Sequence, residues 1–426
     1  MVLKRQPSVR ALLVTASFLA AALAQACEPP APGGGEDAAA DLPTEANIEA
    51  ALASITEEEI RDYVQVLASD EFGGRAPSSN GEELTIQYLT EQFASLGLEP
   101  GGENGSWVQE VPLVAITADP DMGLTIRGAG GERTFEYGPE FVAGTPRVVE
   151  SVGFENSELV FVGYGAVAPE YDWNDYAGVD VTGKTVVVLV NDPGFATQDP
   201  DLFNGNAMTY YGRWTYKYEE GARQGADAVL IVHETAPAAY GWATVENGWT
   251  GTQFNLVTED DNMGRVAAEG WITLETAEAI FDMADLDYQE LKARAQEPGF
   301  EAVPMGDLTA SLAINNTVER SSSRNFLAKL PGATRPDEVV IYMGHWDHFG
   351  TDPSLEGDQV FNGAVDNALG VAGVLELAGL INRLPMPPRR CAGWQTVIVT
   401  AACWPWAEGA TIGRIWRMPG RRWWGR

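Results

Sequence analysis

Two of the three histidines in this 426-residue chain lie in one short stretch together with an acidic residue. Residues 344–348 read Gly-His-Trp-Asp-His, so His345 precedes Asp347 by two positions, and Asp366 follows in a turn-rich segment. Imidazole and carboxylate are common zinc ligands, and a neighbouring carboxylate can hold the imidazole in one tautomer. We therefore expect His345 and Asp366 to bind zinc and Asp347 to orient His345. A His-X-Asp pair alone is also typical of two hydrogen-bonded loop residues.

The flanking residues predict how these side chains are positioned. Residues 339–343 are an uncharged β-branched and aromatic run ending at Gly344, which is typical of a buried strand in a mostly parallel sheet. Ligands often bind at the carboxyl ends of such strands. From Asn367 onward apolar residues recur at helical spacing, which places Asp366 at or just before the start of a helix.

Longer segments around these residues resemble a known family. They read RNFLAKLPG (324–332), RPDEVVIYMGHWDHFG (335–350) and GDQVFNGAVDNALGVAGVLELA (357–378). The chain resembles the zinc aminopeptidases with two co-catalytic metals, which are similar to bacterial leucyl aminopeptidase and glutamate carboxypeptidase. The subgroup it resembles carries an inserted protease-associated domain, and the likeness extends over about residues 56–390.

The resemblance implies two zinc ions, with His345 binding one, Asp366 bridging both and Asp347 orienting His345. It also implies a peptide substrate that loses its N-terminal residue, although a dipeptidase or carboxypeptidase specificity stays open. The residues that bind the substrate are not identified by the sequence. His233, which follows an apolar run inside the expected insert, has no partner in the sequence and is interpreted as structural.

The implied fold is α/β, with a mostly parallel or mixed sheet flanked by helices. It corresponds to a C-terminally truncated zinc exopeptidase fold with an inserted β-rich α+β protease-associated domain. We expect a signal peptide (1–26), a flexible linker (27–50), a discontinuous peptidase domain (51–150 and 305–390), the insert (151–304) and an aberrant tail (391–426).

The N-terminus has the composition of an export signal. Basic residues precede an apolar run at residues 11–24, which is too short to span a membrane as a helix. Ala24-Gln25-Ala26 fits the cleavage site of an ordinary signal peptide. The alternative is a lipoprotein signal, in which Cys27 is the lipid-modified residue. The protein is therefore expected to be exported, either as a periplasmic or outer-membrane lipoprotein or as a secreted protein.

Two helices are expected before the insert. Residues 56–59, Thr-Glu-Glu-Glu, form a capping box before apolar residues at helical spacing. A second helix runs from Gly81 to Gly97. Between them, residues 69–77 resemble a segment of the same family, but their residue types predict only a loop.

The C-terminal part departs from the family pattern. A strand is expected at residues 395–401, but the Glu-Glu pair that should follow it is replaced by Ala402-Cys403. Residues 389–426 contain six of the 13 tryptophans and seven arginines against one acidic residue. We interpret this tail as frameshifted or truncated rather than as a nucleic-acid or membrane patch. The chain is then an impaired peptidase, and the alternative is a non-catalytic, receptor-like binding protein or an inactive fragment.

Composition limits the remaining function classes. The net charge of −34 argues against nucleic acid as a partner. Only three cysteines are present, so no disulfide framework is expected. Oligomeric state cannot be read from the sequence. The absent C-terminal elements should leave apolar surface exposed and solubility poor.

Overall fold

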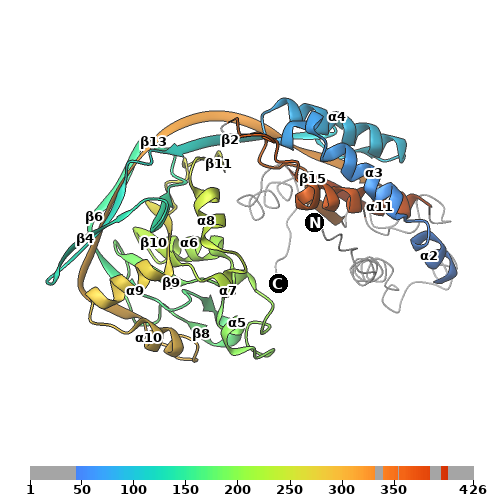
Figure 1. The fold of residues 1–426 in the computed structure, drawn as a ribbon. Helices are drawn as coiled ribbons and strands as arrows, with labels where there is room; N and C mark the ends of the chain where they lie inside the picture. The colour runs from blue at the N-terminus through green and yellow to red at the C-terminus, as the bar shows by residue number, and fades with distance from the viewer. Residues whose placement is uncertain (1–44, 332–338, 354, 384–394, 402–426) are drawn as a thin grey trace, which may run out of the picture. The chain divides into compact units, whose positions relative to one another are not determined.

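The computed structural model describes residues 45–331, 339–353, 355–383 and 395–401 (Figure 1). They divide into two compact units: unit 1 comprises Met1–Pro112 and Ser322–Arg426, and unit 2 comprises Leu113–Ser321. The predicted signal peptide, Cys27, the Ala402-Cys403 pair and most of the predicted tail lie outside the described residues.

Unit 1 contains helices packed on a short mixed sheet. The sheet order is β1-β13-β15-β14; β14 runs parallel to β15, and the other pairs are antiparallel. The unit comprises α2 (Glu45–Leu52), α3 (Glu57–Leu67), η2 (Asp70–Arg75), α4 (Asn80–Ser95), β1 (Glu99–Pro100), η3 (Glu103–Gly105), β14 (Val339–His345), η6 (Ala364–Ala368), α11 (Leu369–Arg383) and β15 (Gln395–Ala401), with parts of β2 (Val108–Ala118) and β13 (Val303–Leu330).

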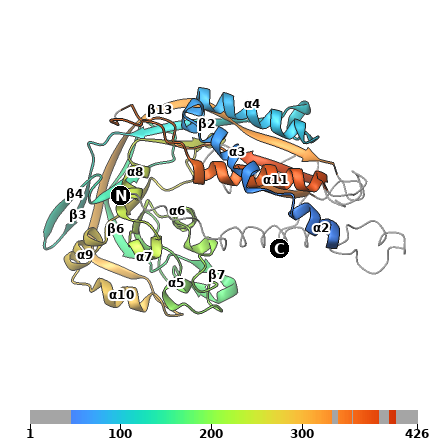
Figure 2. The same ribbon diagram turned by 45° about the vertical axis from the view of Figure 1, so that its right-hand side comes forward.

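The helices of unit 1 share one apolar core. Thr56 caps α3 and its hydroxyl accepts from the amide of Glu59, which confirms the predicted capping box. Gly97 follows α4 with φ of +77°, as predicted for the end of that helix. Helices α3, α4 and α11 lie together in Figure 2 and contribute Leu67, Leu89 and Leu375 to the core.

Two expectations for unit 1 are corrected. The last part of the predicted linker is helical, because Ile48, Ala51 and Leu52 of α2 pack against Leu377 and Leu380 of α11. The run at residues 339–343 forms a strand as predicted, but the prediction that it is buried is wrong. Every residue of β14 is at least partly exposed, because β15 is its one strand neighbour among the described residues.

Unit 2 has a more completely covered sheet. Strands β6, β9, β10 and β12 run parallel in this order, and β5 continues the sheet antiparallel to β12. The unit comprises β3 (Gly123–Gly128), β4 (Gly131–Glu136), β5 (Phe141–Gly144), β6 (Ser151–Phe161), β7 (Val167–Ala168), η4 (Pro169–Tyr171), β8 (Trp173–Asn174), β9 (Thr185–Leu189), α5 (Pro193–Thr197), η5 (Tyr210–Gly212), α6 (Trp214–Arg223), β10 (Ala228–Val232), α7 (Thr235–Ala238), α8 (Trp242–Trp249), β11 (Thr252–Leu256), β12 (Ala268–Ile272), α9 (Leu274–Met283) and α10 (Tyr288–Arg294).

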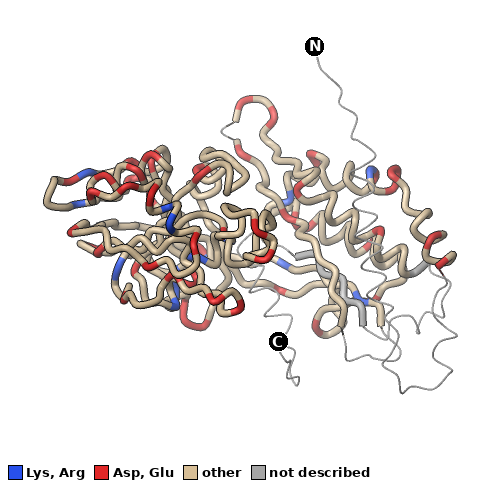
Figure 3. The backbone as a smooth tube through the Cα atoms, turned by 90° about the horizontal axis from the view of Figure 1, so that it is seen from below, with Lys and Arg blue, Asp and Glu red and all other residues tan. Residues whose placement is uncertain are grey.

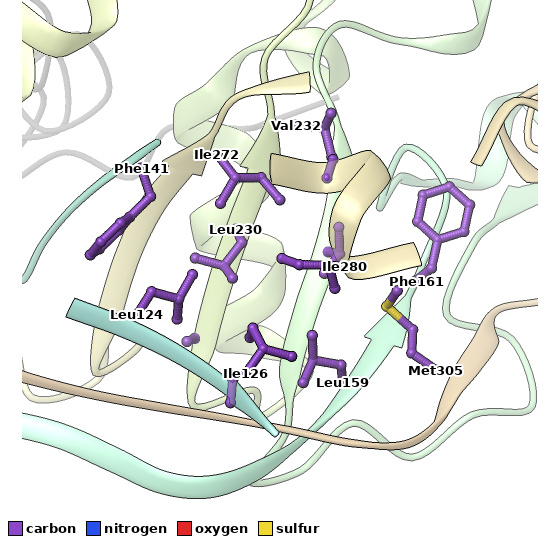
Figure 4. Packing of buried hydrophobic residues seen from close by; sticks show 14 of the residues in the cluster. Leu124, Ile126, Phe141, Leu159, Phe161, Leu230, Val232, Ile272, Ile280 and Met305 are labelled. Atoms are coloured by element: carbon purple, nitrogen blue, oxygen red, sulfur yellow. The ribbon is translucent and has the colours of Figure 1, made fainter. Parts of the chain in front are cut away.

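Alternate residues of the central strands of unit 2 enter two different cores. Leu230 and Val232 of β10 pack with Ile280 of α9 on one face (Figure 4). Val229 and Ile231 pack with Tyr218 of α6 on the other face. Because helices cover both faces, all five residues of each of β9, β10 and β12 are buried.

The boundaries of unit 2 differ from those expected for the insert. The sequence placed them near residues 150 and 305, whereas the compact units divide inside β2 and β13. The difference arises because β3 and β5, which precede residue 150, pair with β13 and β12 of unit 2. Such long-range pairing leaves no local signal in the sequence.

Acidic residues are distributed along the backbone of both units (Figure 3). Among the described residues, one helix is long and apolar enough by composition to cross a membrane, at Ala364–Ile381. More than half of it, 56%, is buried inside unit 1, so it is weak evidence for a membrane span.

Candidate metal centre

His345 is the last residue of β14 and lies between two carboxylates. Its Nδ1 is 3.2 Å from Oδ1 of Asp347 and 3.1 Å from the carbonyl oxygen of the same residue. Its Nε2 is 3.1 Å from Oδ1 of Asp366. Nδ1 faces two acceptor oxygens of Asp347 and Nε2 faces one of Asp366, so we assign the proton of the neutral ring to Nδ1, which has the larger number of acceptors. The lone pair on Nε2 then points toward Asp366.

Asp366 belongs to η6, the irregular turn before α11. Its peptide bond to Asn367 is cis. The side-chain amide of Asn367 donates to the carbonyl of His345 at 3.3 Å, and its oxygen accepts from the amide of Gly370 at 3.1 Å. Asn367 therefore links the start of α11 to the end of β14 and holds Asp366 beside His345.

The surroundings shift the pKa values of the two histidines in the site in opposite directions. Burial opposes the charged form of His345, but the hydrogen bond and charge of Asp347, together with the charge of Asp366, outweigh it and raise its pKa. Burial lowers the pKa of His348, and the charge of Arg75 acts in the same direction. A metal ion at His345 would therefore have to displace a proton from a larger fraction of the chains as the pH falls.

The segment Asp70–Arg75 contacts both loops of the site. The amide of His348 donates to the carbonyl of Arg75 at 3.2 Å, and the amide of Gly350 donates to that of Gly74 at 3.0 Å. On the other loop, the side-chain amide of Asn362 donates to Asp70 at 2.8 Å. The sequence predicted only a loop here. Its residue types did not reveal these contacts, because the partners lie far away in the chain.

Two glycines allow the loops to approach so closely. Gly74 has φ of +65°, and a Cβ there would stand 2.2 Å from the carbonyl oxygen of Gly350. Gly363 has φ of +59°, and its Cβ would stand 2.6 Å from Cγ of His348. A side chain at either position would separate the loops that carry His345 and Asp366.

The donor pair fits part of a zinc site. Two donors on one tetrahedral zinc at about 2.0–2.1 Å stand about 3.3 Å apart, close to the observed separation of Nε2 and Oδ1. In the part of the chain that the structure describes, no group of three His, Cys, Asp or Glu side chains is positioned to hold a metal. The described residues thus bring together two candidate ligands, His345 and Asp366, with Asp347 beside Nδ1 of His345.

His233 of unit 2 has a separate, apolar environment. Its Nε2 is 3.0 Å from the carbonyl of Tyr240, and the rings of Tyr240, Trp242 and Trp271 surround it at centroid distances of 5.6–6.2 Å. Burial lowers its pKa and so favours the neutral form. This packing agrees with the structural interpretation of His233.

The segment that contains the candidate ligands matches a known family of peptidases. Residues 325–392 match the family model described as Peptidase family M28, and this segment includes His345, Asp347 and Asp366. The match is limited to this segment and agrees with the family that the sequence resembles there. No curated protein matches the chain.

Several solved structures of peptidases are similar to this chain. An aminopeptidase from Aneurinibacillus sp. strain AM-1 is 22% identical over 84% of this chain and 64% of its own, with a TM-score of 0.40. A peptidase M28 precursor from Shewanella amazonensis SB2B is 17% identical over 84% and 66%, with a TM-score of 0.37. A zinc aminopeptidase from Bacillus subtilis is 15% identical over 81% and 61%, with a TM-score of 0.33. The chain therefore spans less than two thirds of each of these structures.

Proposed function

We propose that this chain derives from an exported zinc aminopeptidase and keeps part of its metal centre. The observation that carries the proposal is the position of the His345 ring, which lies between Asp347 and Asp366. The match of residues 325–392 to a peptidase family supports the same reaction class. The substrate is a peptide, and the N-terminal residue is the one removed.

His345 and Asp366 would hold the zinc, and Asp347 would keep the proton on Nδ1 so that Nε2 can bind. When bound, zinc polarises a peptide carbonyl and lowers the pKa of a bound water. The resemblance implies two ions, but the described residues supply ligands for part of one site. Because Ala402-Cys403 replaces the expected Glu-Glu pair, we propose that turnover is impaired.

The alternative is a non-catalytic, receptor-like binding protein or an inactive fragment. The small number of ligands among the described residues favours it. Under either function, unit 2 is proposed to be the protease-associated insert, which would control access of the peptide rather than take part in the chemistry. Neither function calls for a nucleic-acid partner.

We also propose that the protein is exported, as a lipoprotein anchored at Cys27 or as a protein cleaved after Ala26. This proposal depends on the apolar run at residues 11–24 and its basic flank. Mass spectrometry of the mature N-terminus distinguishes the two routes. A diacylglyceryl group on Cys27 supports the anchor, and an unprocessed Met1 contradicts export.

The function is tested by counting zinc ions per purified mature chain, together with hydrolysis of a panel of aminoacyl-anilides. We expect bound zinc that is lost in the His345→Ala variant and retained in the matched His233→Ala variant, with weak, chelator-sensitive hydrolysis. Zinc without hydrolysis would favour the binding protein. Neither zinc nor hydrolysis would contradict the peptidase proposal and leave the inactive fragment.

A further inference from the structure

Arg75 is completely buried in unit 1, yet its guanidinium donates four hydrogen bonds to main-chain carbonyls. Its Nε donates to Trp346 at 2.7 Å, one Nη donates to Asn362 at 2.8 Å and to Leu67, and the other donates to Gly363 at 2.9 Å. A guanidinium presents its donors in a rigid plane, so this side chain fixes several backbone segments at once.

Three of the four acceptors lie on the two loops that carry the candidate ligands, and the fourth, Leu67, is the last residue of α3. Trp346 stands between His345 and Asp347, and Gly363 lies three residues before Asp366. Loss of the guanidinium would remove one donor from each of these carbonyls, and a carbonyl away from water that loses its donor is destabilised. Arg75 is therefore one of the groups that connect the two loops, beside the side chain of Asn367.

We propose that Arg75 is the positioning residue of the metal centre: it holds the His345 loop and the Asp366 loop at the distance at which both side chains can bind one ion. The inference rests on the proposed zinc site.

The charge of Arg75 acts against metal binding, and this permits a test. Burial lowers its pKa to about 10, while Asp347 and Asp366 oppose that shift, so the group stays charged at neutral pH near the metal position. If Arg75 acted through its charge, a neutral replacement would strengthen metal binding. If it acts by positioning, a neutral replacement and a lysine should both weaken binding.

The first measurement is the affinity of the protein for Co²⁺, followed by visible absorption. The affinity for Zn²⁺ is then measured by its competition with Co²⁺. We expect Arg75→Lys and Arg75→Met each to weaken affinity by about 10- to 100-fold, as loss of supporting residues around a metal typically does. The control is Arg324→Lys in the same unit, because Arg324 pairs with Glu82 and Glu83 instead. Unchanged or tighter binding by the folded Arg75→Met variant would overturn the proposal.

The second measurement is hydrogen exchange, which needs neither metal nor activity. The amide of His348 donates to Arg75, and the amide of Ala368 donates to Gly363, whose carbonyl Arg75 also contacts. In the unaltered chain we expect the hydrogen bonds of these two amides to open in one event, with equal free energies of opening. In the Arg75→Lys variant we expect both amides to lose their protection from exchange together.

The two measurements separate the inference from the proposed function. Independent exchange of the two amides in the unaltered chain would overturn the role of Arg75, even if the variants fail to fold. Absence of metal binding in the unaltered chain would contradict the proposed function, and the exchange result would still decide whether Arg75 fixes the loops.

Discussion

Strand β10 of unit 2 and strand β14 of unit 1 have similar sequences but different environments. Both are uncharged runs rich in β-branched residues, and both run parallel to a neighbour. Each residue of β10 is buried because β9 and β12 flank it and helices cover both faces of the sheet. No residue of β14 is buried. The comparison shows that the burial of a strand is decided by its neighbours and not by its own residues.

The two units also differ in how they use a buried cation. Arg75 donates to four main-chain carbonyls and keeps its charge, because its lowered pKa is still about 10. Lys217 of unit 2 donates to the carbonyls of Tyr164 and Asn191 at 2.5 and 2.8 Å. Burial lowers its pKa to about 7, although Asp175 and Asp192 oppose the shift. Unit 2 thus contains a cation that can lose its charge near neutral pH.

The largest expected effect comes from truncating equivalent strand residues. Ile231→Ala in β10 should cost about 2–5 kcal/mol because it leaves a cavity in a closed core. Ile341→Ala in β14 should cost about 1 kcal/mol, since its side chain already contacts water. Urea denaturation, with the transition of each unit followed separately, measures both. Equal costs would show that β14 is covered in solution and would remove the contrast between the strands.

A second comparison concerns adjacent glycines of the Asp70–Arg75 segment. Both have positive φ, but a Cβ at Gly73 would meet nothing within 4 Å, whereas one at Gly74 would meet the carbonyl of Gly350. Gly73→Ala should cost about 1–2 kcal/mol from backbone strain alone. Gly74→Ala should cost about 1–3 kcal/mol more, because the loop must move. Thermal unfolding measures the difference, and equal losses would mean that the close approach contributes nothing to unit 1.

The smallest expected effect is a pH dependence confined to unit 2. Between pH 7 and 10.5 unfolded Lys217 binds a proton that the folded state does not, so stability rises with pH. The rise from pH 7.5 to 8.5 should be about 1 kcal/mol. It should disappear in Lys217→Met and be absent from unit 1, where Arg75 stays charged in both states.

Urea denaturation at each pH tests the Lys217 prediction. Asp175 acts in the opposite direction: burial raises its pKa to about 7, and its effect on stability falls mainly below that pH. A slope that survives in Lys217→Met would assign the pH dependence to another group.

Local signals in the sequence predicted the elements but not their surroundings. The capping box at Thr56 and the strand at residues 339–343 follow from a few neighbouring residues, and both are present. His345, Asp347 and Asp366 were also identified by their types and spacing, and the structure brings them together. Whether their proposed roles are correct depends on the zinc measurement.

The features that were not predicted from the sequence depend on contacts between residues far apart in the chain. Arg75 was overlooked because its acceptors are backbone carbonyls, which every residue has. The exposure of β14 was missed because it depends on which strands lie beside it. The same part of the chain, residues 343–369, contains the exposed apolar side chains of Met343, Phe349, Leu355, Phe361, Val365 and Leu369.

The contact between Arg75 and Gly363 joins residues 288 positions apart, and this separation determines the order in which the protein can fold. All of unit 2 is one continuous segment, so its core can form before the second half of unit 1 has been synthesised. Helices α3 and α4 are made first, but their apolar faces stay uncovered until β13 and α11 are available. The early helices of unit 1 are therefore the part of the nascent chain that most needs protection from aggregation.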